Sequence, residues 1–167
     1  MKINIRIAIA LLCNVFLLAC GSAPPPPVVV APPPPAPTVV SLQLEAGTDI
    51  NADSSNQASP VMLKIYELVD PSNFVAADFF ALFNNEQATL ANTLVRKQEL
   101  LLKPGESKTL QLQPQAQTTA LGFFAAFRQL DTGQWRAISP VVPQQTQSWL
   151  LKVQGNQVSI QEQKKTK

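Results

Sequence analysis

Residues 38–46, TVVSLQLEA, alternate apolar and polar side chains with a period of two. The apolar positions are Val40, Leu42, Leu44 and Ala46. Successive side chains of a β-strand point to opposite faces of the sheet. The alternation therefore predicts a strand with one face in a hydrophobic core and the other face in water.

Similar short segments recur along the rest of the chain. They predict further strands at residues 61–69, 93–102, 108–113, 120–130, 134–138, 148–153 and 157–161. Turn formers separate several of them: KPGES at 103–107, DTG at 131–133 as a tight hairpin, and QGN at 154–156. Many short antiparallel strands joined by such turns are typical of a β-sandwich. We therefore expect an all-β fold of two sheets with minor α content.

One predicted strand, LGFFAAF at 121–127, is apolar on both faces, so we expect it in the middle of its sheet. One side would meet the other sheet and the other side a helix. The end of this strand carries Arg128, and Trp135 begins the next strand. We expect these two side chains to make a cation–π or packing contact at the sheet edge.

The segment FVAADFFALFNN predicts that helix. Ser72 or Asn73 would cap its N-terminus, and Phe79 and Phe83 would stack one turn apart. Asp78 lies near the helix start, where its charge would stabilise the positive end of the helix dipole. We interpret the phenylalanines as core packing against the sandwich rather than as a ligand site.

The N-terminus has the pattern of an export signal. Lys2 and Arg6 precede an apolar run, and Leu-Leu-Ala stands directly before Cys20. The apolar run is shorter than the roughly 20 residues that span a membrane. The end of the signal resembles the lipobox of bacterial lipoproteins, in which the cysteine is acylated and becomes the first residue. The alternative is an incidental cysteine in a secretory signal. Gly21 in place of aspartate would, by the same resemblance, direct the protein to the outer membrane.

Residues 24–37 read PPPPVVVAPPPPAP. Proline favours the extended polyproline II conformation, which rises about 3.1 Å per residue, so this segment predicts a semi-rigid spacer of up to about 43 Å. The expected organisation is a signal at 1–19, an acylated Cys20 and tether at 20–37, a β-sandwich domain at 38–163 and a basic tail at 164–167. The tail is interpreted as solvated, with contact to an anionic surface as the alternative.

The composition of the chain argues against several classes of protein function. Loss of Lys2 and Arg6 with the signal leaves 11 basic and 11 acidic residues, a neutral chain that does not favour nucleic acid. The chain contains no histidine, and its cysteines are Cys13 in the signal and Cys20. Histidine-dependent catalysis, a disulfide and a zinc site are therefore not expected, and we predict neither cofactor nor small-molecule substrate. The rival view of a small hydrolase would place its chemistry on Asp49 or Asp53.

Fragments spread over residues 42–153 resemble the outer-membrane lipoprotein of bacterial type VI secretion systems, the TssJ (VasD, SciN) family. No single fragment is specific to this family, but the order and spacing of the fragments behind a lipobox are specific to it. They are Pro60-Val61, LKIYEL at 63–68, Phe74, ADF at 77–79, Leu82, LKPGE at 102–106, Gly122, AFR at 126–128 and Trp135-Arg136.

This resemblance implies a transthyretin-like two-sheet sandwich with a short added helix, tethered by lipid to the outer membrane and facing the periplasm. It also implies docking onto the periplasmic C-terminal region of a TssM-type inner-membrane protein, linked in turn to a TssL-type protein. The family's partner contact lies in the loop between the first two strands, here residues 47–60. The residues that this implies are Gly47, Asp49, Asn51, Asp53, Ser54, Asn56 and Pro60, with the polar ones at the tip of the loop.

Two alternatives stay open. The loop at 47–60 is long for a connection between strands, yet it could be a plain surface connector. The protein could also be an envelope lipoprotein that binds glycan or peptidoglycan through one sandwich face. That function needs an exposed aromatic platform, for which Tyr66, Trp135 and Trp149 are the candidates, although the alternation around Trp149 favours the core.

Overall fold

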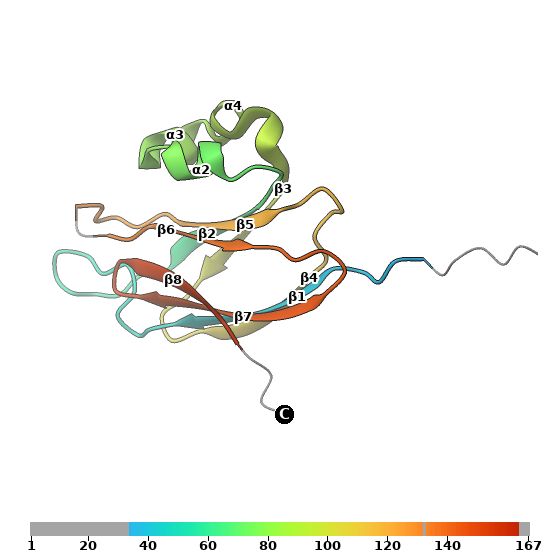
Figure 1. Ribbon diagram of the computed structural model, residues 1–167. Helices are drawn as coiled ribbons and strands as arrows, with labels where there is room; N and C mark the ends of the chain where they lie inside the picture. The colour runs from blue at the N-terminus through green and yellow to red at the C-terminus, as the bar shows by residue number, and fades with distance from the viewer. Residues whose placement is uncertain (1–33, 132, 164–167) are drawn as a thin grey trace, which may run out of the picture. The chain divides into compact units, whose positions relative to one another are not determined.

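The structure is a computed structural model that describes residues 34–131 and 133–163 (Figure 1). The predicted signal, Cys20, most of the proline-rich segment and the basic tail lie outside the described residues. A compact unit begins at Pro35. Among the described helices, none has the length and apolar character needed to cross a membrane.

Eight strands form two four-stranded sheets, which confirms the predicted β-sandwich. The first sheet has the order β4-β1-β7-β8: Ser107–Leu112, Val39–Ala46, Thr146–Gln154 and Gln157–Glu162. The second has the order β3-β2-β5-β6: Leu94–Leu102, Val61–Leu68, Ala120–Ala125 and Arg136–Pro140. The pairing is antiparallel except between β1 and β7, which run parallel.

The main core lies between the two sheets. The apolar face of β1 is buried there as predicted, with Val40, Leu42 and Leu44 inaccessible to solvent. Trp149 of β7 belongs to the same cluster, together with Phe123 of β5. Strand β5 is buried along its whole length, which confirms its predicted central place.

A layer of short helices covers the outer face of the second sheet (Figure 1). It consists of α2 (Ser72–Ala76), α3 (Phe79–Asn84), α4 (Glu86–Leu90) and one 3-10 turn, η1 (Ala91–Thr93). A second apolar cluster fills the space beneath them and contains Tyr66, Leu68, Phe74, Leu82, Leu90 and Phe124. The sheet is therefore buried on both faces where the helices lie.

The prediction of one helix, capped by Ser72 or Asn73, was wrong. Ala77 and Asp78 adopt extended backbone conformations and separate α2 from α3. The N-cap residue of α2 is Pro71, and the carboxylate of Asp70 accepts hydrogen bonds from the amide and the hydroxyl of Ser72. Asp78 acts at the start of α3, where its carboxylate accepts a hydrogen bond from the amide of Ala81 at 2.8 Å.

The connection between β5 and β6 also differs from the prediction. Strand β5 ends at Ala125 and β6 begins at Arg136, so the connection between them, 126–135, is longer than the predicted DTG hairpin, although the amide of Gly133 does donate to the carbonyl of Leu130 at 3.2 Å. The amide of Arg128 donates to the side-chain oxygen of Asn51 at 2.8 Å, which bonds this connection to the loop between β1 and β2. The cation–π contact with Trp135 is made by Arg136, whose guanidinium lies 4.7 Å from the ring, so its assignment to Arg128 was wrong.

Candidate functional site

The loop between β1 and β2, residues 47–60, lies at the end of the sandwich where β1 finishes (Figure 1). The β3–β4 turn, the 126–135 loop and the β7–β8 turn lie at the same end. The chain enters β1 at the other end. Eight strand residues separate the two, about 27 Å at a rise of roughly 3.4 Å per residue.

The base of the loop is fixed to its neighbours. Gly47 donates its amide to the carbonyl of Val153 at 2.8 Å and accepts a bond from the amide of Gly105 at 3.0 Å. The amide of Asn51 donates to the carbonyl of Gly155 at 2.9 Å. Ile50 is fully buried in the main core. These contacts hold the loop on a rigid platform made by the β3–β4 and β7–β8 turns.

Gly47 lies close to the side chain of Asp49. A Cβ atom there would approach the carboxylate oxygen of Asp49 to 2.5 Å. Asp49 itself is exposed beside the platform. Gly47 thus fixes the base of the loop through its backbone bonds, whereas Asp49 presents a charge to solvent.

Asn51 is not at the polar tip, as the resemblance had implied, but is 3% exposed. Its amide group donates to the carbonyl of Pro60 at 2.9 Å, and its side-chain oxygen accepts from the amide of Arg128 at 2.8 Å. Its φ of 50° lies in the left-handed region that asparagine tolerates better than most residues. Asn51 is therefore the residue that closes the loop and ties it to the 126–135 segment, while Pro60 contributes its carbonyl to that closure.

The tip is a small turn organised by Asp53. Its carboxylate accepts bonds from the amides of Ser55 at 2.8 Å and Gln57 at 3.0 Å. Asn56 donates its amide to the carbonyl of Asp53 and has a φ of 58°. Asp53 is half-buried, and the side chains of Ser54, Ser55, Asn56 and Gln57 are exposed. Ser55 and Gln57 were not singled out from the sequence, because only the turn shows that they face outward with Ser54 and Asn56.

A separate ionic cluster fastens the helical layer to the second sheet. Glu86 of α4 accepts hydrogen bonds from Lys64 at 2.8 Å, from the hydroxyl of Tyr66 at 2.7 Å and from Lys97, which also pairs with Glu99 at 2.8 Å. Burial by itself would raise the pKa of Glu86, but the hydrogen bonds from Lys64, Lys97 and Tyr66 outweigh it and lower that pKa. Burial and then the neighbouring Glu86 raise the pKa of Tyr66, which keeps its hydroxyl a donor. The role of this cluster is to hold α4 in place.

The three candidate residues do not form an aromatic platform on the surface. Tyr66 and Trp149 are buried, and Trp135 is half-buried and packs against both apolar clusters. Within the part of the chain that the structure describes, no three or more His, Cys, Asp or Glu side chains are grouped to hold a metal ion.

Comparisons with known proteins place the chain in a family. The model of the family described as "Type VI secretion lipoprotein, VasD, EvfM, TssJ" matches residues 38–156. The solved structure of the type VI secretion lipoprotein TssJ1 from Pseudomonas aeruginosa is 36% identical, with a TM-score of 0.75 over 78% of this chain and 99% of that chain. A sequence comparison with curated proteins finds no match.

Two further solved structures share the fold. One is Lip from Serratia marcescens, described as a membrane-bound component of the type VI secretion system, at 24% identity and a TM-score of 0.69 over 78% of this chain and 100% of that chain. The other is a chain in a structure described as the C-terminal domain of the type VI protein TssM from EAEC, at 23% identity and a TM-score of 0.63 over 74% of this chain and 98% of that chain. The sandwich, its helical layer and the match over residues 38–156 together show that this chain belongs to the TssJ family of type VI secretion lipoproteins.

Proposed function

We propose that the protein is the outer-membrane lipoprotein of a type VI secretion membrane complex. It is held by acyl chains on Cys20, faces the periplasm and docks the periplasmic domain of a TssM-type inner-membrane protein, which links it to a TssL-type protein. Its role is attachment, with no reaction to catalyse. Membership of the lipoprotein family and the TssM description of a structure with the same fold support this proposal.

The observation that carries the proposal is the separation of the two ends of the sandwich. The described chain enters at Pro34 and passes into β1 at one end, and the 47–60 loop stands at the other (Figure 1). Membrane attachment through the proline-rich segment would therefore leave the loop free to meet a partner. The loop also has a fixed base and an exposed polar tip, so it binds with little ordering of its own backbone.

Replacement of Cys20 by alanine tests the anchor. Several acyl chains together bind a membrane stably, because each buried CH₂ contributes about 0.8 kcal/mol. We expect Cys20→Ala to leave the sandwich folded and to move the protein from the outer-membrane fraction to the soluble periplasm. Retention of the unmodified variant in the membrane fraction would contradict lipid anchoring.

A variant that tests binding by the loop must keep the loop residues on which the fold depends. Shortening all of residues 47–60 would remove Ile50 from the core, at a cost of about 2–5 kcal/mol, and the hydrogen bonds of Asn51. The suitable variant combines Ser54→Ala, Ser55→Ala, Asn56→Gly and Gln57→Ala. It keeps Asp53 and allows a positive φ at position 56.

We expect this tip variant to unfold like the parent chain and to bind the purified periplasmic domain of the TssM-type partner at least about tenfold more weakly, a change of about 1.4 kcal/mol measurable by calorimetry. Three exposed glutamines near the opposite end provide a control, in the variant Gln113→Ala, Gln115→Ala, Gln117→Ala. This control should bind normally. Equal affinity of the tip variant and the control would move the interface away from the loop.

A further inference from the structure

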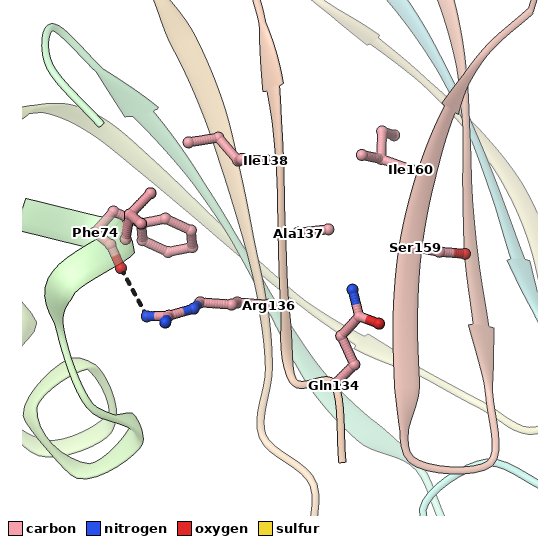
Figure 2. Close-up of a pocket in the computed structure, with 8 residues that line it drawn as sticks. Phe74, Gln134, Arg136, Ala137, Ile138, Ser159 and Ile160 are labelled. Atoms are coloured by element: carbon pink, nitrogen blue, oxygen red, sulfur yellow. Dashed lines mark hydrogen bonds between the residues drawn. The ribbon is translucent and has the colours of Figure 1, made fainter. Parts of the chain in front are cut away.

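A groove of about 400 Å³ runs along the open side of the sandwich, where the edge strands β6 and β8 of the two sheets diverge (Figure 2). The two strands meet only at its start, where Gln134 and Gln157 form a bridge and the amide of Val158 donates to the carbonyl of Gln134 at 2.8 Å. Beyond that bridge, Ala137 and Ile138 of β6 face Ser159 and Ile160 of β8 across the groove.

The floor of the groove is the free backbone edge of β6. The carbonyl of Trp135 accepts from the amide of Ala125, and the amide of Val141 donates to the carbonyl of Thr119. In an antiparallel pair, hydrogen-bonded and non-hydrogen-bonded residues alternate. The odd-numbered residues of β6 therefore bond to β5, and the amides and carbonyls of Arg136 and Ile138 point into the groove.

Pro140 fits the same alternation. It pairs with Ala120 at a position whose amide would point into the groove and away from β5. Proline lacks that amide, so it costs the sheet no hydrogen bond there and ends the free edge.

The two walls of the groove are largely apolar. One wall belongs to α2, with Phe74 and the 50% exposed Val75, and it continues over Ile138, which is 36% exposed. Arg136 crosses this wall and donates to the carbonyls of Phe74 at 3.1 Å and Ala77 at 2.6 Å, which fixes α2 at the groove (Figure 2).

The other wall is β8. The amide of Gln163 donates to the carbonyl of Ser148, so the odd-numbered residues of β8 are the ones that bond to β7. The backbone amide and carbonyl of the even-numbered Ile160 therefore point away from β7 and toward the groove. The side chain of Ile160 packs at the margin of the main core. A row of free backbone donors and acceptors between two apolar walls is the surface that an added β-strand requires.

We propose that this groove receives an extended segment of the same periplasmic partner, which adds a strand to the free edge of β6 and places alternate apolar side chains against Ile138 and Ile160. The proposal rests on the proposed function. The position of the groove favours this partner as its occupant. The groove starts at Gln134, beside the 126–135 loop and the β7–β8 turn. Asn51 bonds the 47–60 loop to both of these segments. A partner seated on that loop would therefore approach the end of the sandwich at which the groove begins.

Amide hydrogen exchange measured by mass spectrometry tests the pairing directly. The acylated chain is compared in detergent with and without the purified periplasmic domain of the TssM-type partner. Within residues 136–140, we expect slower exchange of the amides of Arg136 and Ile138 in the complex, and no change along the edge strand β3. If the complex forms and protects residues 47–60 but leaves residues 136–140 unchanged, the groove proposal is overturned and the docking function stands.

Two other outcomes of this experiment are equally decisive. If no complex forms, the proposed function fails and this inference fails with it. If the amides of Arg136 and Ile138 are already protected without the partner, the occupant is a second copy or a segment of the chain itself, and the assignment to the partner is overturned.

A matched pair of variants provides an independent measure. Ile138→Lys places a charge on the groove wall, whereas Leu101→Lys places one at a 53% exposed position on β3. Both side chains are partly exposed, so thermal unfolding should remain close to that of the parent chain. We expect Ile138→Lys to weaken partner binding at least tenfold and Leu101→Lys to leave it unchanged. Equal affinity of the two variants would overturn the proposal.

Discussion

Asn51 joins three separate parts of the chain through one side chain. It lies between the first two strands, bonds to Pro60 at the far end of its own loop, and holds the amide of Arg128 in the 126–135 segment. Because both bonds are largely shielded from water, leaving their partners unsatisfied is costly.

Asn51→Ala should therefore lower the free energy of unfolding. The matched control is Asn56→Ala, since Asn56 has a similar φ of 58° but an exposed side chain. Both variants place alanine in the left-handed region, so the difference between them reports the hydrogen bonds. We expect Asn51→Ala to cost about 1–3 kcal/mol more in urea unfolding. Equal costs would mean that Asn51 acts only through its backbone conformation.

Glu86 gives stability a defined dependence on pH. Its pKa in the folded chain lies below the ordinary value of 4.5, so its ionisation stabilises the fold above that value. The contribution is lost as the pH falls through the lowered pKa. Hydrogen bonds to Glu86 and then Glu99 raise the pKa of Lys97, so the contribution of Lys97 is lost only as the pH rises above its ordinary value of 10.5.

Glu86→Gln should thus destabilise the protein by about 1–3 kcal/mol near neutral pH, and the difference from the parent chain should shrink below about pH 4. Glu162→Gln, at an exposed position of β8, is the control and should change little. Urea unfolding between pH 3 and pH 8 measures both. A difference that stays constant down to pH 3 would show that the charge of Glu86 contributes nothing.

Single residues could be assigned from the sequence only when the contact was local. Asp78 was predicted to act at a helix start, and it does so because its partner amide is three residues away. Asn51 and Arg136 have partners 77 and about 60 residues distant. No spacing pattern in the sequence contains such partners.

Among the elements, the helical layer depends on one close approach. Phe74 of α2 packs over Gly122 of β5, where an added Cβ would lie 3.0 Å from the ring and 3.2 Å from Leu68. A side chain at this position would push α2 away from the sheet. The layer is otherwise held by Glu86 and by the buried Leu82 and Leu90.

Gly122→Ala is expected to destabilise the fold by about 1–3 kcal/mol through overpacking. The cost should be smaller when the ring is first removed by Phe74→Leu, because the two residues share the same space. A double-mutant cycle by chemical denaturation measures this coupling. Additive effects of the two substitutions would mean that the strand and helix relax independently.

The division into three short helices illustrates a limit of sequence patterns. The apolar spacing of FVAADFFALFNN correctly indicated helical structure on the sheet. The breaks at Asp78 and Asn85 arise because each short helix has to place its own residue, Phe74, Leu82 or Leu90, over a particular part of the sheet. That requirement depends on the shape of the sheet.

For the molecule as a whole, we expect the folded unit to need none of the residues before Pro35. A chain that begins at Pro35 should unfold with the same free energy as one that begins at Cys20, within about 0.5 kcal/mol. A chain that begins at Leu42 is the control. It lacks Val40, which is fully buried, and should lose at least about 2 kcal/mol. Lower stability of the chain from Pro35 would show that the preceding segment contributes to the fold.

The amino-acid sequence alone determined the two-sheet sandwich, since alternation with a period of two and turn residues between the strands act over only a few neighbours. The family resemblance was visible for the same reason, because its fragments lie within those strands and turns. Tertiary structure alone decided which residues of the 47–60 loop are buried, where the helices break and that the edges of β6 and β8 diverge into a groove. These features arise where segments distant in the chain meet, and they depend on sheet order and register, which local patterns do not contain.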